Sequence, residues 1–432
     1  MKLLLTGDVH VGRASSSVPE DRIKQYLAAS AWERIVDAAI DQGVAAVLVS
    51  GDLVEQSNRY FEARGPIEAG LRRLTERGIR TVAVAGNHDH DILPRFADEF
   101  ASRGLAFELL GRNGTWSETR IAAGGESVTV LGWSFPRGEV REDPLGSFRS
   151  EAGGAAATIG LVHGDLGVAS SKYAPLDASM LESKPVAGWL LGHIHARSLR
   201  AAAGVPWILY PGSPQALDPG ETGVHGAWIA EVSGRTVSVP RAIPLSTVRY
   251  ERHRVDVSGR GDAGGLRVAI DGSVQDLADR SRADGGRHLT DLVVDLEVFG
   301  ATAAASSVAE VLGELSDIAP VGPLAVRVRT TSDRTTPPLD LEALAGGHGL
   351  PGLLSRAILA LEAGNRDAPE AKSLLQKVLP LRDEIRLQST VRRGDVEEPA
   401  TLDETFFRDE AIKTARTLLA SIIDASSEGG EP

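Results

Sequence analysis

Five short polar motifs in the first half of the chain carry residue types that bind metal ions. The set combines two carboxylates, one amide and four imidazoles: Asp8, His10, Asp52, Asn87, His163, His193 and His195. Mixed oxygen and nitrogen ligands suit Mn, Fe or Zn better than Ca or Mg, which prefer oxygen alone. Two-metal sites are typical of phosphate-ester hydrolysis. The motifs therefore predict a pair of divalent metal ions and a hydrolase.

Each motif follows an apolar run of strand length, at residues 3–5, 45–49, 81–84, 158–162 and 189–191. Short apolar runs that end in Gly or Asp are typical of buried strands entering loops. Within residues 8–10 and 193–195 the ligands stand two apart, so extended backbone places both side chains on one face. We expect the strand ends to converge on one crevice at the carboxyl edge of a sheet.

The ordered motifs resemble those of the calcineurin-like metallophosphoesterase superfamily. Gly7-Asp8-Val9-His10 near the start and Tyr210-Pro211-Gly212-Ser213 after the last His pair are most similar to SbcD-type nucleases of DNA double-strand-break repair. The resemblance covers about the first half of the chain. It implies an α/β fold, with a four-layer α/β/β/α sandwich followed by a small α+β capping domain and a helical C-terminal tail.

The resemblance also implies how the ligands divide between two sites, with the residue that matches Asp52 bridging both metals. The first site is completed by the residues matching Asp8, His10 and His195. The second site is completed by the residues matching Asn87, His163 and His193. A carboxylate that bridges two cations holds them about 3.5 to 4 Å apart.

His88 matches the superfamily's catalytic histidine, which contacts the phosphate or the leaving group. A positioned imidazole that protonates the leaving oxygen contributes about two to four orders of magnitude in rate. We expect Asp89 to orient His88. SbcD-type nucleases commonly carry a second histidine shortly after the Gly-Asp motif, where this chain has Glu55. A glutamate offers no hydrogen-bond donor to a phosphodiester at neutral pH.

Residues next to the motifs are candidates for binding substrate: Arg13, Arg59, Tyr60, Arg95 and Arg197. Arginine contacts phosphate oxygens, and tyrosine stacks on bases. The alternative is that the arginines are solvated or ion-paired loop charges and that the tyrosine is a partly buried aromatic.

The length of 432 residues predicts two or three domains. We place a catalytic domain at 1–245, an α+β capping domain at 246–335 and a helical partner-binding region at 350–425. In the second of these, residues 267–270, 292–296 and 324–328 are predicted strands, and helices are expected around 274–282 and 303–315. Residues 330–351, rich in Thr, Asp, Pro and Gly, are predicted to be a linker.

The net charge of −13 argues against broad, nonspecific binding of nucleic acid, because that affinity comes largely from Lys and Arg. Part of this negative charge belongs to acidic metal ligands, whose charge is compensated when metal ions bind. The chain has no cysteine, runs directly from Met1 to the ligand Asp8, and has no apolar run of membrane-spanning length. We expect a cytoplasmic protein that does not enter a membrane.

Amphipathic helices are predicted around residues 32–40 and 67–74, and after a capping-box pattern at 401–404. In the resembling nucleases the early helices form a homodimer interface, and a helical C-terminal segment grips the coiled coil of an SbcC-type ATPase. Packing of these faces against their own chain is the alternative in both cases.

Three functions follow from these patterns. The favoured one is a Mn-dependent DNA exo/endonuclease subunit that works with the ATPase. The second is a metallophosphoesterase that acts on a small-molecule nucleotide, a cyclic nucleotide or a phosphoprotein. The third, a scaffold with weak catalysis, is disfavoured because all expected ligands and His88 are present.

Overall fold

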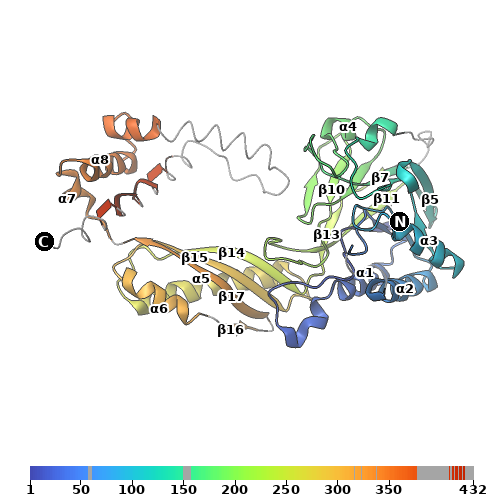
Figure 1. Ribbon diagram of the computed structural model, residues 1–432, viewed down its shortest axis with the longest axis horizontal. Coiled ribbons are helices and arrows are strands. Elements are labelled where there is room, and N and C mark those ends of the chain that lie inside the picture. The colour runs from blue at the N-terminus through green and yellow to red at the C-terminus, as the bar shows by residue number, and fades with distance from the viewer. Residues whose placement is uncertain are drawn as a thin grey trace. The chain divides into compact units, whose positions relative to one another are not determined.

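The computed structural model describes residues 1–56, 61–148, 157–315, 317–322, 324–336 and 338–376, and the positions 408, 411, 412, 414–416, 418–420, 422 and 423. It is a mixed α/β protein with several sheets and helices (Figure 1). The chain divides into two compact units. The first comprises Met1–Arg252, Asp276–Asp295 and Ile318–Arg329, and the second His253–Gln275, Leu296–Asp317 and Thr330–Pro432. Across the described residues, every helix is too short or too polar to cross a bilayer.

The first sheet carries three of the predicted ligand-bearing strands side by side. Its order is β12-β11-β1-β2-β3-β4, and β13 pairs with β11. The strands are β1 (Lys2–Thr6), β2 (Ala46–Val49), β3 (Arg80–Ala83), β4 (Phe107–Leu109), β11 (Gly226–Ser233), β12 (Thr236–Val237) and β13 (Arg241–Pro244). Strands β1 to β4 run parallel, so their carboxyl ends lie at one edge.

The second sheet carries the other two ligand-bearing strands, in the order β5-β6-β7-β8-β10-β9. The strands are β5 (Ser117–Ala123), β6 (Glu126–Trp133), β7 (Ala157–His163), β8 (Gly188–Gly192), β9 (Ser198–Arg200) and β10 (Trp207–Tyr210). Strands β6, β7, β8 and β10 are parallel neighbours. All five strands predicted before the motifs are therefore confirmed.

Apolar side chains fill the space on both faces of the first sheet. Helices α1 (Ala28–Gln42), α2 (Phe61–Glu76) and α3 (Leu93–Ser102) share one core with Leu4 and Val47 of the sheet. The opposite face, with Leu5 and Leu48, packs against Ile159 and other residues of the second sheet. Alternating strand residues thus feed two cores, because successive side chains point to opposite faces. Short helices complete the connections: η1 (Glu20–Tyr26), η2 (Arg112–Gly114), η3 (Pro144–Ser147) and α4 (Ala178–Glu182).

The helix predicted around residues 32–40 is confirmed as α1, and its C-terminal stop has a clear cause. Gly43 adopts a φ of +61° and its N–H bonds back to the carbonyls of Ala39 and Ile40. A left-handed residue is the common way to end a helix, and glycine adopts it without steric cost. The helix predicted around residues 67–74 is confirmed as α2.

The third sheet has the order β14-β15-β17-β16, with strands β14 (Val248–Asp256), β15 (Asp291–Ala301), β16 (Asp317–Val321) and β17 (Leu324–Thr336). Helix α5 (Ala263–Asp284) lies along it in Figure 1, followed in sequence by η4 (Ala305–Ser307) and α6 (Val308–Gly313). The prediction of a strand at residues 267–270 is wrong, because this run lies inside α5. A run of four residues is too short for the spacing of its apolar positions to distinguish a buried strand from one turn of a helix.

The region predicted to be a linker is also more regular than expected. Strand β17 continues to Thr336, α7 covers Leu341–Ala345 and α8 begins at Leu350 and ends at Glu362. Residues 369–376 and the described residues from 408 to 423 are helical. The capping-box pattern at 401–404 lies outside the described residues. In the second unit, a cluster of buried side chains joins α7 and α8 to the tail: Leu341, Leu354, Ile358, Ala415 and Leu419. The described part of the tail therefore packs on its own chain.

Candidate metal centre

The ligands predicted from the sequence converge at the carboxyl ends of strands from both of the first two sheets. Asp8, Asp52 and Asn87 follow β1, β2 and β3, whereas His163 ends β7 and His193 follows β8. The expectation of a single sheet edge is therefore corrected to two facing sheets. Two sheets allow ligands to approach the centre from opposite sides, which one row of strand ends does not provide.

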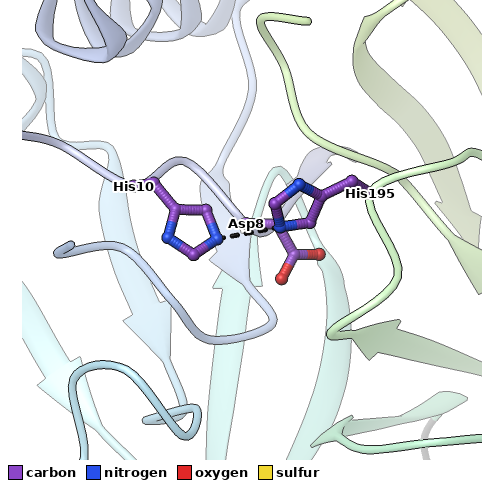
Figure 2. Close-up of side chains that lie close together, drawn as sticks. All are labelled: Asp8, His10 and His195. Atoms are coloured by element: carbon purple, nitrogen blue, oxygen red, sulfur yellow. Dashed lines mark hydrogen bonds between the residues drawn. The ribbon is translucent and has the colours of Figure 1, made fainter. Parts of the chain in front are cut away.

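Asp8, His10 and His195 form the first group of ligand atoms (Figure 2). The Nε2 atoms of His10 and His195 face each other at 3.0 Å. Asp8 is fully buried, and one carboxylate oxygen, Oδ1, accepts a hydrogen bond of 2.9 Å from the His193 backbone N–H. The other oxygen, Oδ2, is buried without a hydrogen-bond partner. A buried carboxylate oxygen with no donor is costly, and a bound cation would satisfy it.

The second group surrounds the Asn87 side chain. Its Oδ1 lies 3.0 Å from His163 Nε2 and 3.1 Å from His193 Nδ1. The same His163 nitrogen lies 3.4 Å from Asp52 Oδ2, and that oxygen lies 3.9 Å from His10 Nε2 of the first group. Asp52 therefore stands between the two groups, which is the place that the bridging role requires.

Four of the seven predicted ligands have a backbone conformation that L-residues rarely adopt. The φ angles are +49° at Asp8, +52° at His10, +48° at Asp52 and +102° at His193. Such conformations cost about 1–3 kcal/mol each and are typical of functional sites. Local strain that coincides with the ligand positions indicates that the fold holds these side chains in place at the expense of stability.

Two glycines in the motifs allow the loops to approach this closely. A Cβ atom on Gly86 would lie 2.2 Å from Asp52 Oδ1, and a Cβ atom on Gly192 would lie 2.1 Å from the Ser50 carbonyl oxygen. Both distances are below any real contact, so a side chain at either position would push the ligand loops apart.

Each of the four predicted histidine ligands has one ring nitrogen directed toward the centre. Its second ring nitrogen contacts an acceptor oxygen on the side away from the centre. His10 Nδ1 lies 3.0 Å from Glu55 Oε2, and His195 Nδ1 lies 2.7 Å from Glu221 Oε1. His163 Nδ1 donates to the Ser50 carbonyl at 2.9 Å, and His193 Nε2 lies 3.4 Å from Asp165 Oδ1. Acceptors of this kind fix the tautomer and ring orientation of metal-binding histidines.

Sequence reasoning did not assign Asp165, Glu221 or Glu55 to this outer layer. Asp165 stands two residues after His163, a spacing that hinted at its position. Glu221 follows no motif at all, and its proximity to His195 arises from the fold. In the sequence, Glu55 stood out only because SbcD-type nucleases commonly carry a histidine there.

His88 lies beside the centre and is about one-third exposed. Its backbone N–H donates to Asp52 Oδ1 at 2.9 Å, and its Nδ1 lies 3.4 Å from Glu55 Oε1. The interaction with Glu55 raises the pKa of His88, against the opposing effect of burial. Because Nδ1 is buried, Nε2 is the ring nitrogen left for a substrate.

Asp89 contacts the backbone rather than the His88 ring. Its carboxylate accepts hydrogen bonds of 2.8 Å from the Gly86 and Leu53 N–H groups and a longer one from Val54. These bonds tie the Asp52 loop to the Asn87 loop. Burial, together with the charge of Asp52, raises the pKa of Asp89 to about 7. Among the described contacts, the carboxylate paired with His88 is that of Glu55, and the orienting role expected of Asp89 stays a prediction.

Burial and neighbouring charges together shift the pKa values of the ionisable side chains in the centre. Burial opposes ionisation of Asp52, but His163 and His10 outweigh it and hold the pKa of this carboxyl well below its usual range. Burial also opposes protonation of His163, yet Asp52 and Asp8 raise the pKa of His163 to about 9. Burial, reinforced by His163, lowers the pKa of His193 to about 3. His193 is therefore neutral at pH 7, the form that binds a metal.

These residues fit a pair of divalent ions. The donor atoms of Asp8, His10 and His195, and those of Asp8, Asp52 and His163, lie within 4.8 Å of one another in each group. The mixture of imidazole nitrogens with carboxylate and amide oxygens suits Mn, Fe or Zn. Asp8 supplies the unpaired oxygen that such an ion would satisfy.

The candidate substrate residues are less closely gathered. Arg13 donates to Asp218 Oδ2 at 2.6 Å. Arg95 lies on α3 rather than on a loop, and both Arg95 and Arg197 are exposed. Arg59 and Tyr60 lie outside the described residues. Their roles in binding substrate stay predictions.

Comparisons with known proteins agree with this chemistry. Residues 1–197 match the calcineurin-like phosphoesterase family. The chain is 29% identical over 250 residues to the uncharacterized metallophosphoesterase YhaO of Bacillus subtilis, covering 56% of this chain and 59% of the relative. It is 28% identical over 260 residues to the DNA double-strand break repair protein Mre11 of Haloferax volcanii, covering 60% of this chain and 55% of the relative.

Among solved structures, the chain is similar to a dimetal phosphatase from Danio rerio, with 13% identity, a TM-score of 0.34, and coverage of 57% of this chain and 99% of that one. The chain spans less than two thirds of the length of the two curated relatives. Together, the family match and the two curated relatives support the calcineurin-like metallophosphoesterase superfamily. The family implies a hydrolase with a dinuclear divalent metal site, and the clustered Asp and His side chains are consistent with it.

Proposed function

We propose that this protein is a binuclear-metal phosphodiesterase that acts as a Mn-dependent DNA exo/endonuclease in DNA repair. The observation that carries the proposal is the convergence of seven metal-ligand side chains beside His88. Similarity to an archaeal DNA double-strand break repair protein favours DNA over other phosphate esters.

In this proposal the ligand groups hold two divalent ions, which supply a nucleophile at neutral pH and stabilise charge on the phosphate. The chain's own residues do the rest. Asp52 holds the two ligand groups together. His88 Nδ1 is buried 3.4 Å from Glu55 Oε1, which leaves Nε2 as the ring nitrogen for the substrate. We assign His88 Nε2 the proton that goes to the leaving oxygen.

The proposal extends to architecture, partners and location. We propose a four-layer α/β/β/α catalytic sandwich, a capping domain built on the third sheet, and a cytoplasmic homodimer. We also propose that the helical C-terminal region binds an SbcC-type ATPase. In this region Leu350, Leu353 and Leu418 are each about half exposed, although the face containing Ala415 and Leu419 is covered by its own chain.

A metallophosphoesterase that acts on a small nucleotide, a cyclic nucleotide or a phosphoprotein is the second candidate. Glu55 favours it, because this buried carboxylate beside His88 repels a polyanion rather than binding it. The net charge of −13 points the same way.

The substrate is tested by incubating the purified protein with Mn and with two substrates, linear DNA and a chromogenic phosphodiester, with and without the copurified ATPase. We expect both to be cleaved. Hydrolysis of the small ester with no action on single- or double-stranded DNA under either condition would contradict the nuclease proposal and support the second candidate.

The role of His88 is tested by His88→Ala. We expect the variant to bind two metal ions while its kcat falls by about two to four orders of magnitude, because it lacks the proton donor. Metal content is measured by elemental analysis, and activity on the chromogenic ester. A kcat close to that of the unmodified protein would remove His88 from the mechanism.

A further inference from the structure

We infer that Glu221 is a positioning residue for His195 and that Ser213 holds Glu221 in place. The inference rests on the proposed function in one respect, which is that His195 binds a metal ion. It assigns a role to the Tyr210-Pro211-Gly212-Ser213 motif, which lies outside the set of metal ligands.

The Glu221 carboxylate is surrounded by donors of defined geometry. Its Oε1 lies 2.7 Å from His195 Nδ1. Its Oε2 accepts hydrogen bonds of 2.9 Å from both the Ser213 hydroxyl and the Leu217 backbone N–H. The side chain is only 12% exposed. Three donors on a mostly buried carboxylate leave it little freedom to move, so it is a rigid acceptor for the imidazole.

This contact decides which nitrogen of His195 reaches the centre. Glu221 accepts the hydrogen bond from Nδ1, so in the neutral ring Nδ1 carries the proton and Nε2 keeps its lone pair. That Nε2 points at His10 Nε2, 3.0 Å away, beside Asp8 (Figure 2). A neutral imidazole without such an acceptor populates both tautomers, and only one of them offers Nε2 to a metal.

The same segment also holds the backbone of His195. The Ser213 N–H donates to the His195 carbonyl at 3.0 Å. Gly212 adopts a φ of +74°, and a Cβ at this position would lie 2.5 Å from that carbonyl oxygen. Ser213 therefore holds His195 in two ways. Its N–H binds the His195 carbonyl directly, and its hydroxyl holds Glu221, which contacts the His195 ring. Gly212 and Ser213 of the motif therefore place this ligand.

The experiment measures binding of Mn²⁺ alone to the metal-free protein by titration calorimetry, for the unmodified chain, Glu221→Gln and Ser213→Ala. We expect two binding events in the unmodified chain. One of them weakens by about 10- to 100-fold in Glu221→Gln, because a weaker acceptor leaves His195 poorly oriented. Ser213→Ala, the milder variant, weakens the same event by a smaller factor. Glu231→Gln, which removes the same charge at an exposed position of β11, leaves both events unchanged.

A second readout needs no metal. Two-bond ¹H–¹⁵N correlation spectra of ¹⁵N-histidine-labelled, metal-free protein report the tautomer of each imidazole. We expect His195 to be in the Nδ1–H form in the unmodified chain and to populate both forms in Glu221→Gln. Unchanged tautomer and unchanged Mn²⁺ affinities in both variants would overturn the inference while leaving the proposed function intact. If the unmodified chain bound no Mn²⁺, the proposed function would fall, and the tautomer would still decide the role of Glu221.

Discussion

The metal centre and the C-terminal helical cluster are held together by opposite means. In the centre, fully buried Asp8 and His163 lie among strained backbone segments, and one oxygen of Asp8 has no partner. In the helical cluster of the second unit, Ile358 and Leu419 are also fully buried, but they belong to a group of apolar side chains. Strained backbone lowers the stability of the centre but holds its ligands in place, whereas burial of apolar side chains stabilises the helical cluster.

This difference predicts that the two regions respond to different perturbations. Removing apolar volume should weaken the helical cluster, whether or not metal is present. Adding a divalent ion should strengthen the centre and leave the cluster unchanged, because the predicted metal ligands lie in the centre.

The largest effect is expected from Ile358→Ala. Deleting a fully buried isoleucine side chain costs about 2–5 kcal/mol in the free energy of unfolding of the second unit, from lost burial and the cavity left behind. Calorimetry with and without Mn measures this cost. Leu353→Ala, a nearly half-exposed position on the same helix, is the matched control and should change stability by about 0.5 kcal/mol or less. Equal losses in the two variants would contradict the apolar origin of the cluster.

A smaller effect is expected from metal binding. At about one hundred times its dissociation constant, Mn should raise the free energy of unfolding of the first unit by about 2.7 kcal/mol, because only the folded state holds the ligands together. Thermal denaturation at several Mn concentrations measures the shift. Asp52→Asn should abolish most of it, since Asp52 stands between both ligand groups. A shift that survives Asp52→Asn would mean that the stabilising ion binds elsewhere.

The smallest effect is expected from Glu55→Gln, a change within the metal centre. Its carboxylate contacts both His10 and His88. The neutral amide is a weaker acceptor for either ring, so we expect kcat on the chromogenic ester to fall by about 10- to 100-fold. Glu142→Gln, at an exposed position, is the control and should retain full activity. An unchanged kcat in Glu55→Gln would show that His88 needs no carboxylate partner.

The sequence predicted the regular elements that carry a strong pattern. Helix α1 was predictable because Trp32, Ile35 and Val36 recur at helical spacing before Gly43. The strand predicted at residues 267–270 was wrong because a run of four residues shows no period, and these residues lie within the 22-residue helix α5. Strand β14 was missed, since the four consecutive polar residues at 251–254 interrupt the alternation of apolar and polar positions that marks a strand.

The residue types of the centre, their attachment to strand ends and the hydrolytic chemistry they suit could be predicted from the sequence, because few side-chain types bind metal ions. The three-dimensional packing of the chain decided that two sheets supply these ligands and that Glu55 lies between His10 and His88. It also decided that Glu221, 26 residues from His195, holds its ring. The physical reason is that a ligand's identity is local, whereas the acceptors that orient it come from whichever segment the packing of the sheets brings within hydrogen-bond distance.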